Sequence, residues 1–225
     1  NGGNTISGGI ASATNASEFT KVGTGDLNIS GNNSDYIGIV NVNEGALNFT
    51  AQSANDSFFN TTNSTVNIAG SSELNINDAG LTDLAAANIN GSGTLSKDGS
   101  GKLNVTGDND GFTGTLEING GEVAYKEQGA NASFFSASSI EMANGTKLSV
   151  DTTSSSGQQG GNISSVGSTE FDKLGTGAFS LIGTNDIGSV NVKAGTLNVE
   201  NNAAGTITYN ADNTDISEGA TLNYT

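Results

Sequence analysis

The sequence predicts an all-β protein folded as a parallel β-helix, a solenoid built from short strands. Three observations lead to this prediction. A block of about 76 residues recurs three times in the 225-residue chain. Within each block, apolar and polar residues alternate over short stretches with the period of a β-strand. Clusters of Gly, Asn, Asp and Ser, which favour tight turns, separate these stretches.

The repeat is visible as three segments that align from a shared lysine onward. These lysines are Lys21, Lys97 and Lys173, and the apolar residues two positions earlier are Phe19, Leu95 and Phe171. A long period that covers the whole chain is typical of a solenoid. We therefore expect one solenoid with units of roughly 19–94, 95–170 and 171–225, in which residues 1–18 end a preceding unit.

Each predicted strand is short and buries two or three apolar side chains, as in Leu27-Asn28-Ile29 and Val40-Asn41-Val42. Equivalent strands recur every 20 to 27 residues or so, a suitable length for one coil of three short strands. Each unit would then hold about three coils and the chain about nine. We expect stacked Asn side chains to form ladders between coils. The absence of Pro agrees, since every coil donates its backbone N–H groups to a neighbour.

Two aromatic pairs stand at equivalent places, Phe58-Phe59 and Phe134-Phe135. We expect each pair where a coil bulges outward in a loop or a short helix, with one ring of each pair in the core. The alternative is an exposed aromatic contact.

The composition excludes several classes of function. The chain has no Cys and no His, which rules out thiolate nucleophiles, Ser-His-Asp triads and Cys- or His-ligated metals. Seven Lys and no Arg stand against 23 Asp and Glu, for a net charge of −16, which argues against nucleic-acid binding. No apolar run is long enough for a transmembrane helix. We expect no enzyme, no cofactor and no metal.

The aligned segments resemble the autotransporter-associated β-strand repeat of Gram-negative bacteria. The first copy carries the pattern at Gly23, Gly25, Leu27, Ile29, Gly31, Asn33, Tyr36, Gly38, Val40, Val42, Gly45, Leu47 and Phe49. The second copy repeats it from Gly99 to Val123 and the third from Gly175 to Leu197. The third copy departs at its first turn, where Ile187 replaces the aromatic residue and two residues are missing.

The resemblance implies a passenger domain of an autotransporter, folded as a right-handed parallel β-helix and displayed outside the cell or secreted. Such a passenger is tethered to the outer membrane by a C-terminal barrel. The sequence shows neither that barrel nor a signal peptide, so we expect a passenger fragment.

Two sets of charged residues are candidates for an interaction surface. Asp35, Asp108, Asp110 and Asp186 cluster in the first turn of each repeat, where they could bind Ca²⁺ or serve glycoside hydrolysis. An Asx-turn role is the simpler interpretation, because the residues recur in every copy. Lys21, Lys97 and Lys173 are expected to form a solvated ladder on one face, paired with neighbouring acids.

The leading functional hypothesis is an adhesin that binds a host receptor or glycan, or another copy of itself, through many weak polar contacts along a rod. A passive stalk that presents a functional tip is the second hypothesis. A toxin or polysaccharide-acting enzyme is the third, and the missing His disfavours a serine protease.

Overall fold

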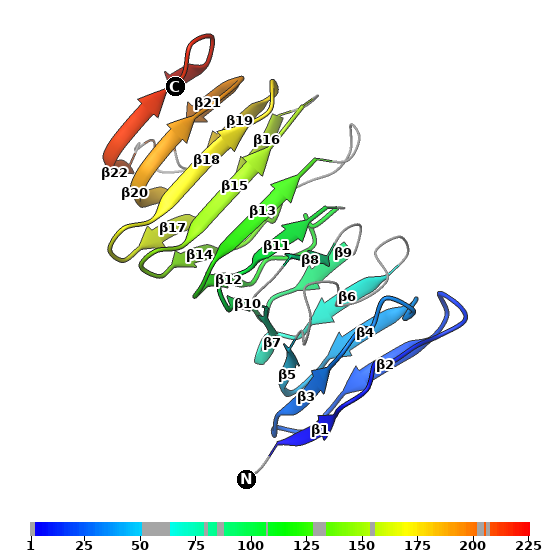
Figure 1. Cartoon of the computed structure of the whole chain (residues 1–225). Helices are drawn as coiled ribbons and strands as arrows, with labels where there is room; N and C mark the ends of the chain where they lie inside the picture. The colour runs from blue at the N-terminus through cyan, green and yellow to red at the C-terminus, as the bar shows by residue number, and fades with distance from the viewer. Residues whose placement is uncertain are drawn as a thin grey trace.

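The computed structural model describes residues 3–50, 64–78, 81–84, 88–106, 108–127, 134–153, 156–201, 205 and 208–225. In these residues the chain forms 23 β-strands and no helix, so the all-β prediction is confirmed. All strand pairs are parallel and stack one above another from the N-terminus to the C-terminus (Figure 1). The result is a β-solenoid of about eight turns, close to the nine that the repeat length suggested.

The strands form three faces, which the chain visits in a fixed order. Face 1 comprises β1 (Asn4–Ile6), β3 (Leu27–Ser30), β5 (Gly45–Thr50), β7 (Ser72–Asn77), β10 (Thr94–Asp98), β12 (Thr115–Ile118), β14 (Ser139–Met142), β17 (Asn162–Ser165) and the first halves of β20 (Thr184–Val192) and β22 (Thr208–Ile216). Face 2 comprises β8 (Leu81–Leu84), β11 (Lys102–Val105), β13 (Glu122–Lys126), β15 (Lys147–Asp151), β18 (Glu170–Leu174) and the second halves of β20 and β22. Face 3 comprises β2 (Glu18–Lys21), β4 (Ile39–Val42), β6 (Thr65–Ile68), β9 (Asn88–Gly91), β16 (Ser156–Gln159), β19 (Ala178–Leu181), β21 (Thr196–Val199) and β23 (Thr221–Tyr224).

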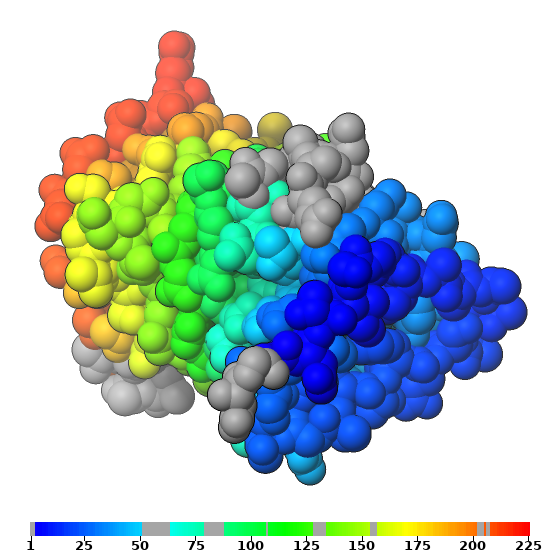
Figure 2. Space-filling model, turned by 60° about the horizontal axis from the view of Figure 1, so that its bottom comes forward, coloured from blue at the N-terminus to red at the C-terminus, as the bar shows by residue number. Residues whose placement is uncertain are grey.

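The core consists of apolar side chains stacked in columns, because successive strands keep the same register. On face 1, for example, Leu47, Leu74, Leu95 and Leu116 lie directly above one another and are fully buried. The space-filling view shows the colours following one another in chain order along the molecule, as expected when each turn packs mainly on its sequence neighbours (Figure 2).

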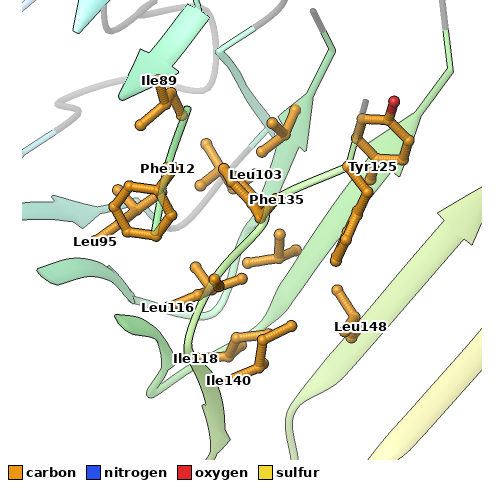
Figure 3. Packing of buried hydrophobic residues seen from close by; sticks show 14 of the residues in the cluster. Ile89, Leu95, Leu103, Phe112, Leu116, Ile118, Tyr125, Phe135, Ile140 and Leu148 are labelled. Atoms are coloured by element: carbon orange, nitrogen blue, oxygen red, sulfur yellow. The ribbon is translucent and has the colours of Figure 1, made fainter. Parts of the chain in front are cut away.

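An aromatic cluster joins the two parts of face 3. Figure 3 shows two of its members, Phe112 and Phe135, among the packed side chains of the core. Phe112 pairs with β9 through Gly91, and its ring lies 5.4 Å from that of Phe135. Phe134 continues the cluster, with its ring 5.3 Å from that of Phe179 on β19. Phe134 and Phe135 are both buried, one ring more than the sequence suggested, and they lie in a loop. The equivalent Phe58-Phe59 lies outside the described residues.

The three repeat copies begin on three different faces. Phe19 lies in β2 on face 3, Leu95 in β10 on face 1 and Phe171 in β18 on face 2. One repeat therefore spans three complete turns plus one further face. Equivalent residues follow a spiral around the rod and do not form a column along it.

Candidate functional site

The lysine shared by the three copies lies inside the solenoid. Lys97 and Lys173 are 0% exposed and Lys21 is 5% exposed. Each stem fills a position that an aliphatic side chain fills in the neighbouring turn, since Lys97 stacks between Ile76 and Ile118. The expectation of a solvated lysine ladder on one face is wrong on both counts. The side chains are buried, and the copies start on different faces.

Each ammonium group donates hydrogen bonds to three backbone carbonyl oxygens, two in its own turn and one in the next. The Lys97 Nζ donates to Asp98, to Gly99 at 3.0 Å and to Gly120 at 3.5 Å. The other copies repeat the arrangement: the acceptors are Val22, Gly23 and Glu44 for Lys21, and Leu174, Gly175 and Ala194 for Lys173. We call this unit the lysine corner. It satisfies the carbonyls of two successive bends with one side chain.

The glycines of the repeat build the backbone of the lysine corner. Gly99 has a φ of +74°, which allows its carbonyl to turn toward the ammonium group. Gly121, in the next turn, has a φ of +64°, and a Cβ there would lie 2.0 Å from the carbonyl oxygen of Gly101. Two turns can approach so closely only where a side chain is missing at this position.

Burial shifts the protonation equilibrium of Lys97 and Lys173. Desolvation lowers the pKa of Lys97 below its usual value, against the opposing charges of Asp78 and Asp98. Desolvation likewise lowers the pKa of Lys173 to about 8, although Asp151 and Glu127 favour the charged form. A buried cation beside carbonyl oxygens serves the fold, and its Nζ is not accessible to a partner.

A buried asparagine is a second interior feature of every copy. Asn33, Asn109 and Asn185 are all 0% exposed. The Asn33 Oδ1 accepts a hydrogen bond from the backbone N–H of Ile10 at 2.7 Å, and the Asn109 Oδ1 accepts one from Ile89 at 3.0 Å. Asn33 and Asn109 therefore join one turn to another from within, whereas Asn185 donates to the carbonyl of Gly183 in its own turn at 2.8 Å.

The four candidate aspartates are exposed and fall in three places: Asp35 in the turn before β4, Asp108 and Asp110 in the turn after β11, and Asp186 in β20. The Asp108 Oδ1 accepts the backbone N–H of Asp110 at 3.4 Å, the contact of an Asx-turn. The Asp186 Oδ1 accepts a bond from Asn210 in the next turn at 2.7 Å, while Asp35 contributes its backbone carbonyl to Ser12. In the part of the chain that the structure describes, no group of three such side chains is placed to hold a metal ion. Asp35, Asp108 and Asp110 lie in turns, as the sequence suggested, whereas Asp186 lies within β20.

Asparagine ladders run along the outside of two faces, as the sequence suggested. On face 1 the Asn75 Nδ2 donates to Asn48 at 2.8 Å, and the Asn48 Nδ2 donates to Asn28 at 2.9 Å. On face 3 Asn67 donates to Asn41 at 2.8 Å, and Asn41 donates to the carboxylate of Glu18 at 2.6 Å. Each member leaves polar groups toward solvent at the spacing of the strands, about 4.8 Å.

Face 2 carries a ladder of charges that sequence reasoning missed. Lys102, Glu122, Lys147 and Glu170 occupy one outward column on four successive strands, so their charges alternate. Lys102 and Glu122 are 3.0 Å apart, and Lys147 and Glu170 are 3.5 Å apart. We call these four residues the charge ladder. The chain separates its members by unequal intervals, so only the register of the strands reveals them.

Asp172 lies on β18 beside Glu170, in the adjacent outward column, and stabilises the Glu170 end of the charge ladder. It is 2% exposed and pairs with Lys147 and, at 2.6 Å, with Lys193. Burial alone would raise the pKa of Asp172, but hydrogen bonds from Lys147, Lys193 and Asn191 outweigh it and hold the pKa at about 2. The carboxylate is therefore charged throughout the physiological range.

Comparison with protein families matches the three aligned copies of the repeat. Residues 19–49, 95–124 and 171–199 match the family model described as the passenger-associated-transport-repeat. The chain carries three passenger-associated-transport-repeats. These repeats indicate an autotransporter passenger region, which confirms the resemblance seen in the sequence. No curated protein and no solved structure matches the chain.

The matched segments show what the passenger-associated-transport-repeat specifies. Each segment contains a complete lysine corner and one buried asparagine. The repeat thus encodes interior contacts between turns, and the outward residues differ between copies. An autotransporter passenger region implies a place outside the cell or on its surface. Within the described residues, no helix has the length and apolar character needed to span a membrane.

Proposed function

We propose that this passenger segment is an adhesive rod. It would attach the cell that displays it to a host receptor or glycan, or to a second cell through another copy of the same rod. The observation that supports this proposal is the set of outward asparagine ladders on faces 1 and 3, which join three successive strands of each face and are held in place by hydrogen bonds.

Stacked polar groups favour recognition by many weak contacts. Each ladder presents amide groups at intervals of about 4.8 Å along a rigid backbone, so a partner with its own periodic groups can engage several at once. Individual contacts of this kind are weak, but their joint occupation raises the apparent affinity strongly when the spacing permits simultaneous engagement. Recognition of this kind requires no catalytic group, in agreement with the absence of Cys and His.

The test is to display the segment on a non-adherent bacterial cell and to measure cell aggregation and attachment to host cells. A matched variant carries Asn48→Ala and Asn67→Ala, one central member of each ladder. We expect weaker aggregation or attachment than with the unchanged segment at equal surface amounts. Equal values for both would contradict the proposal.

A passive stalk is the second candidate, and one observation favours it. The lysine and the asparagine shared by all three copies lie inside the rod, where they stabilise the fold and cannot contact a partner. Replacing the segment by an unrelated solenoid of equal length separates the two candidates. If the replacement restores attachment fully, the segment is a stalk, and if it fails, the segment itself makes the contact.

A further inference from the structure

Face 2 differs from the rest of the molecule in its charge. Three of the seven lysines are buried in lysine corners. The remaining four all lie on face 2 or at its edge: Lys102, Lys126, Lys147 and Lys193. Five acids share this stretch of the face or its edge: Glu122, Glu127, Asp151, Glu170 and Asp172. Face 2 is therefore close to neutral over these turns in a chain whose net charge is −16.

Face 1 shows the opposite character. Glu117 and Glu141 stand directly above one another on β12 and β14, with no lysine in the same outward column. Glu73, on the same face, has a pKa raised by burial and by the charge of Glu117. A second copy that approached through face 1 would add further negative charge to a surface that already repels itself.

We propose that two copies of this chain associate side by side and antiparallel through face 2. The inference rests on the self-association arm of the proposed function and identifies the surface involved. The order of charges in the charge ladder is plus, minus, plus, minus. Reversing this order gives minus, plus, minus, plus, so an inverted copy offers the opposite charge at each level.

The geometry of such a pair follows from symmetry. A two-fold axis that lies in the interface and runs across the two rods, between the levels of Glu122 and Lys147, brings the column of one copy against the same column of the other. Lys102 then faces Glu170 of the second copy, and Glu122 faces Lys147 of the second copy. Each pairing occurs twice, which gives four complementary contacts. In a parallel pair in register, like charges would stand at the same level.

The exposure of the ladder permits these contacts. The side chains of Lys102 and Glu170, at its two ends, are each 41% exposed, while Glu122 and Lys147 are 24% and 26% exposed. Their pairing within one chain leaves the solvent side of each group free for a partner. The five strands from β11 to β20 span about 24 Å by 17 Å, or roughly 400 Å² on each copy, which is the size of a weak, transient contact. A rod that adheres by many weak contacts needs an interface of this strength.

The experiment uses two single charge reversals, Lys102→Glu and Glu170→Lys, and measures association of the purified chain by sedimentation equilibrium at 0.15 M salt. Each variant alone places two like-charged contacts in the antiparallel pair, so we expect its self-association to weaken at least about tenfold. A mixture of the two variants restores all four complementary contacts. We therefore expect the mixture to associate about as strongly as the unchanged chain.

Glu117→Lys on face 1 is the matched control, because it changes the net charge by the same amount as Glu170→Lys. We expect it to leave association unchanged or to strengthen it. Association of the mixture no stronger than that of each single variant would overturn the antiparallel face 2 pair. Equal weakening by Glu117→Lys and Glu170→Lys would overturn it as well.

These results also separate the inference from the proposed function. If the unchanged chain associates but the mixture is not restored, self-association stands and face 2 is the wrong surface. If the unchanged chain stays monomeric up to millimolar concentration, both the pair and the self-association arm are overturned, and binding to a host receptor or glycan remains.

Discussion

Replacement of Lys97 by methionine is the sharpest test of the lysine corner. Methionine is unbranched and fills the column between Ile76 and Ile118 much as the lysine stem does, so no large cavity arises. The change removes the ammonium group that satisfies the carbonyls of Asp98, Gly99 and Gly120. The substitution therefore isolates the hydrogen bonds from the packing.

The size of the effect follows from the number of carbonyls. A buried acceptor left without its partner costs about 1 kcal/mol or more, so three of them cost roughly 3 kcal/mol. Relief of the buried charge offsets part of this, and we expect a net loss of about 2–3 kcal/mol in the free energy of unfolding. For a chain of this size that corresponds to a fall of roughly 4–12 °C in the melting temperature.

Urea denaturation followed by circular dichroism measures the loss. The matched control is Lys126→Met on β13, where the lysine is exposed, and its expected effect lies within about 0.5 kcal/mol of zero. We expect Lys21→Met and Lys173→Met to weaken the protein in the same direction as Lys97→Met. If Lys97→Met is no more destabilising than Lys126→Met, the lysine corner does not stabilise the solenoid and the reasoning fails.

Three further predictions concern the turns, the acid response and the core. Gly121→Ala should destabilise the protein by about 3 kcal/mol or more, since its Cβ would lie 2.0 Å from a carbonyl oxygen. Gly145→Ala should cost only about 1 kcal/mol, because Gly145 also has a positive φ but has open space around it. Thermal melting compares the two variants. Because the pKa of Asp172 is depressed to about 2, the stability that its carboxylate gives the folded chain is present above pH 4 and is lost as the pH falls toward 2. An acid titration of the free energy of unfolding should show a smaller loss in Asp172→Asn. The exposed control Asp110→Asn should show the same loss as the unchanged chain. Phe135→Ala should lower the free energy of unfolding in urea by about 3–5 kcal/mol, and a loss below about 1 kcal/mol would contradict its place in the core.

The architecture could be predicted from the sequence because its signals are local. Alternation of apolar and polar residues marked the strands, as in Val40-Asn41-Val42, and turn residues marked the bends. The asparagine ladders followed from the same alternation, since Asn41 and Asn67 occupy equivalent places in their strands. These features depend on contacts between neighbouring residues or on a register that the repeat itself displays.

The burial of the lysines was missed because a lysine is normally exposed. The alternation along the strand did indicate this burial, because Lys97 follows Leu95 by two residues and must point to the same side of the strand. Its partner carbonyls lie in two different turns, and a sequence does not show how bends approach one another. The rotation of the repeat was missed for a related reason, since a period of about 76 residues does not state how many faces it covers.

The charge ladder could not have been found without the register of the strands. Lys102, Glu122, Lys147 and Glu170 fall at unequal intervals in the chain because the turns between them differ in length. Loops between solenoid strands vary freely while the strands stay aligned, so column neighbours are hidden in the sequence. The residues that form one surface column on such a rod therefore come from different turns of the chain.

The central claim is that the repeat determines the interior of the rod, with its shared lysine buried in every copy. Labelling of the folded chain with an amine-reactive reagent, followed by mass spectrometry of its peptides, tests this most directly. We predict rapid labelling of the lysines on face 2: Lys102, Lys126, Lys147 and Lys193. We predict protection of Lys21, Lys97 and Lys173 until the chain is unfolded in denaturant. Labelling of these three at the rate of the other four would contradict the account.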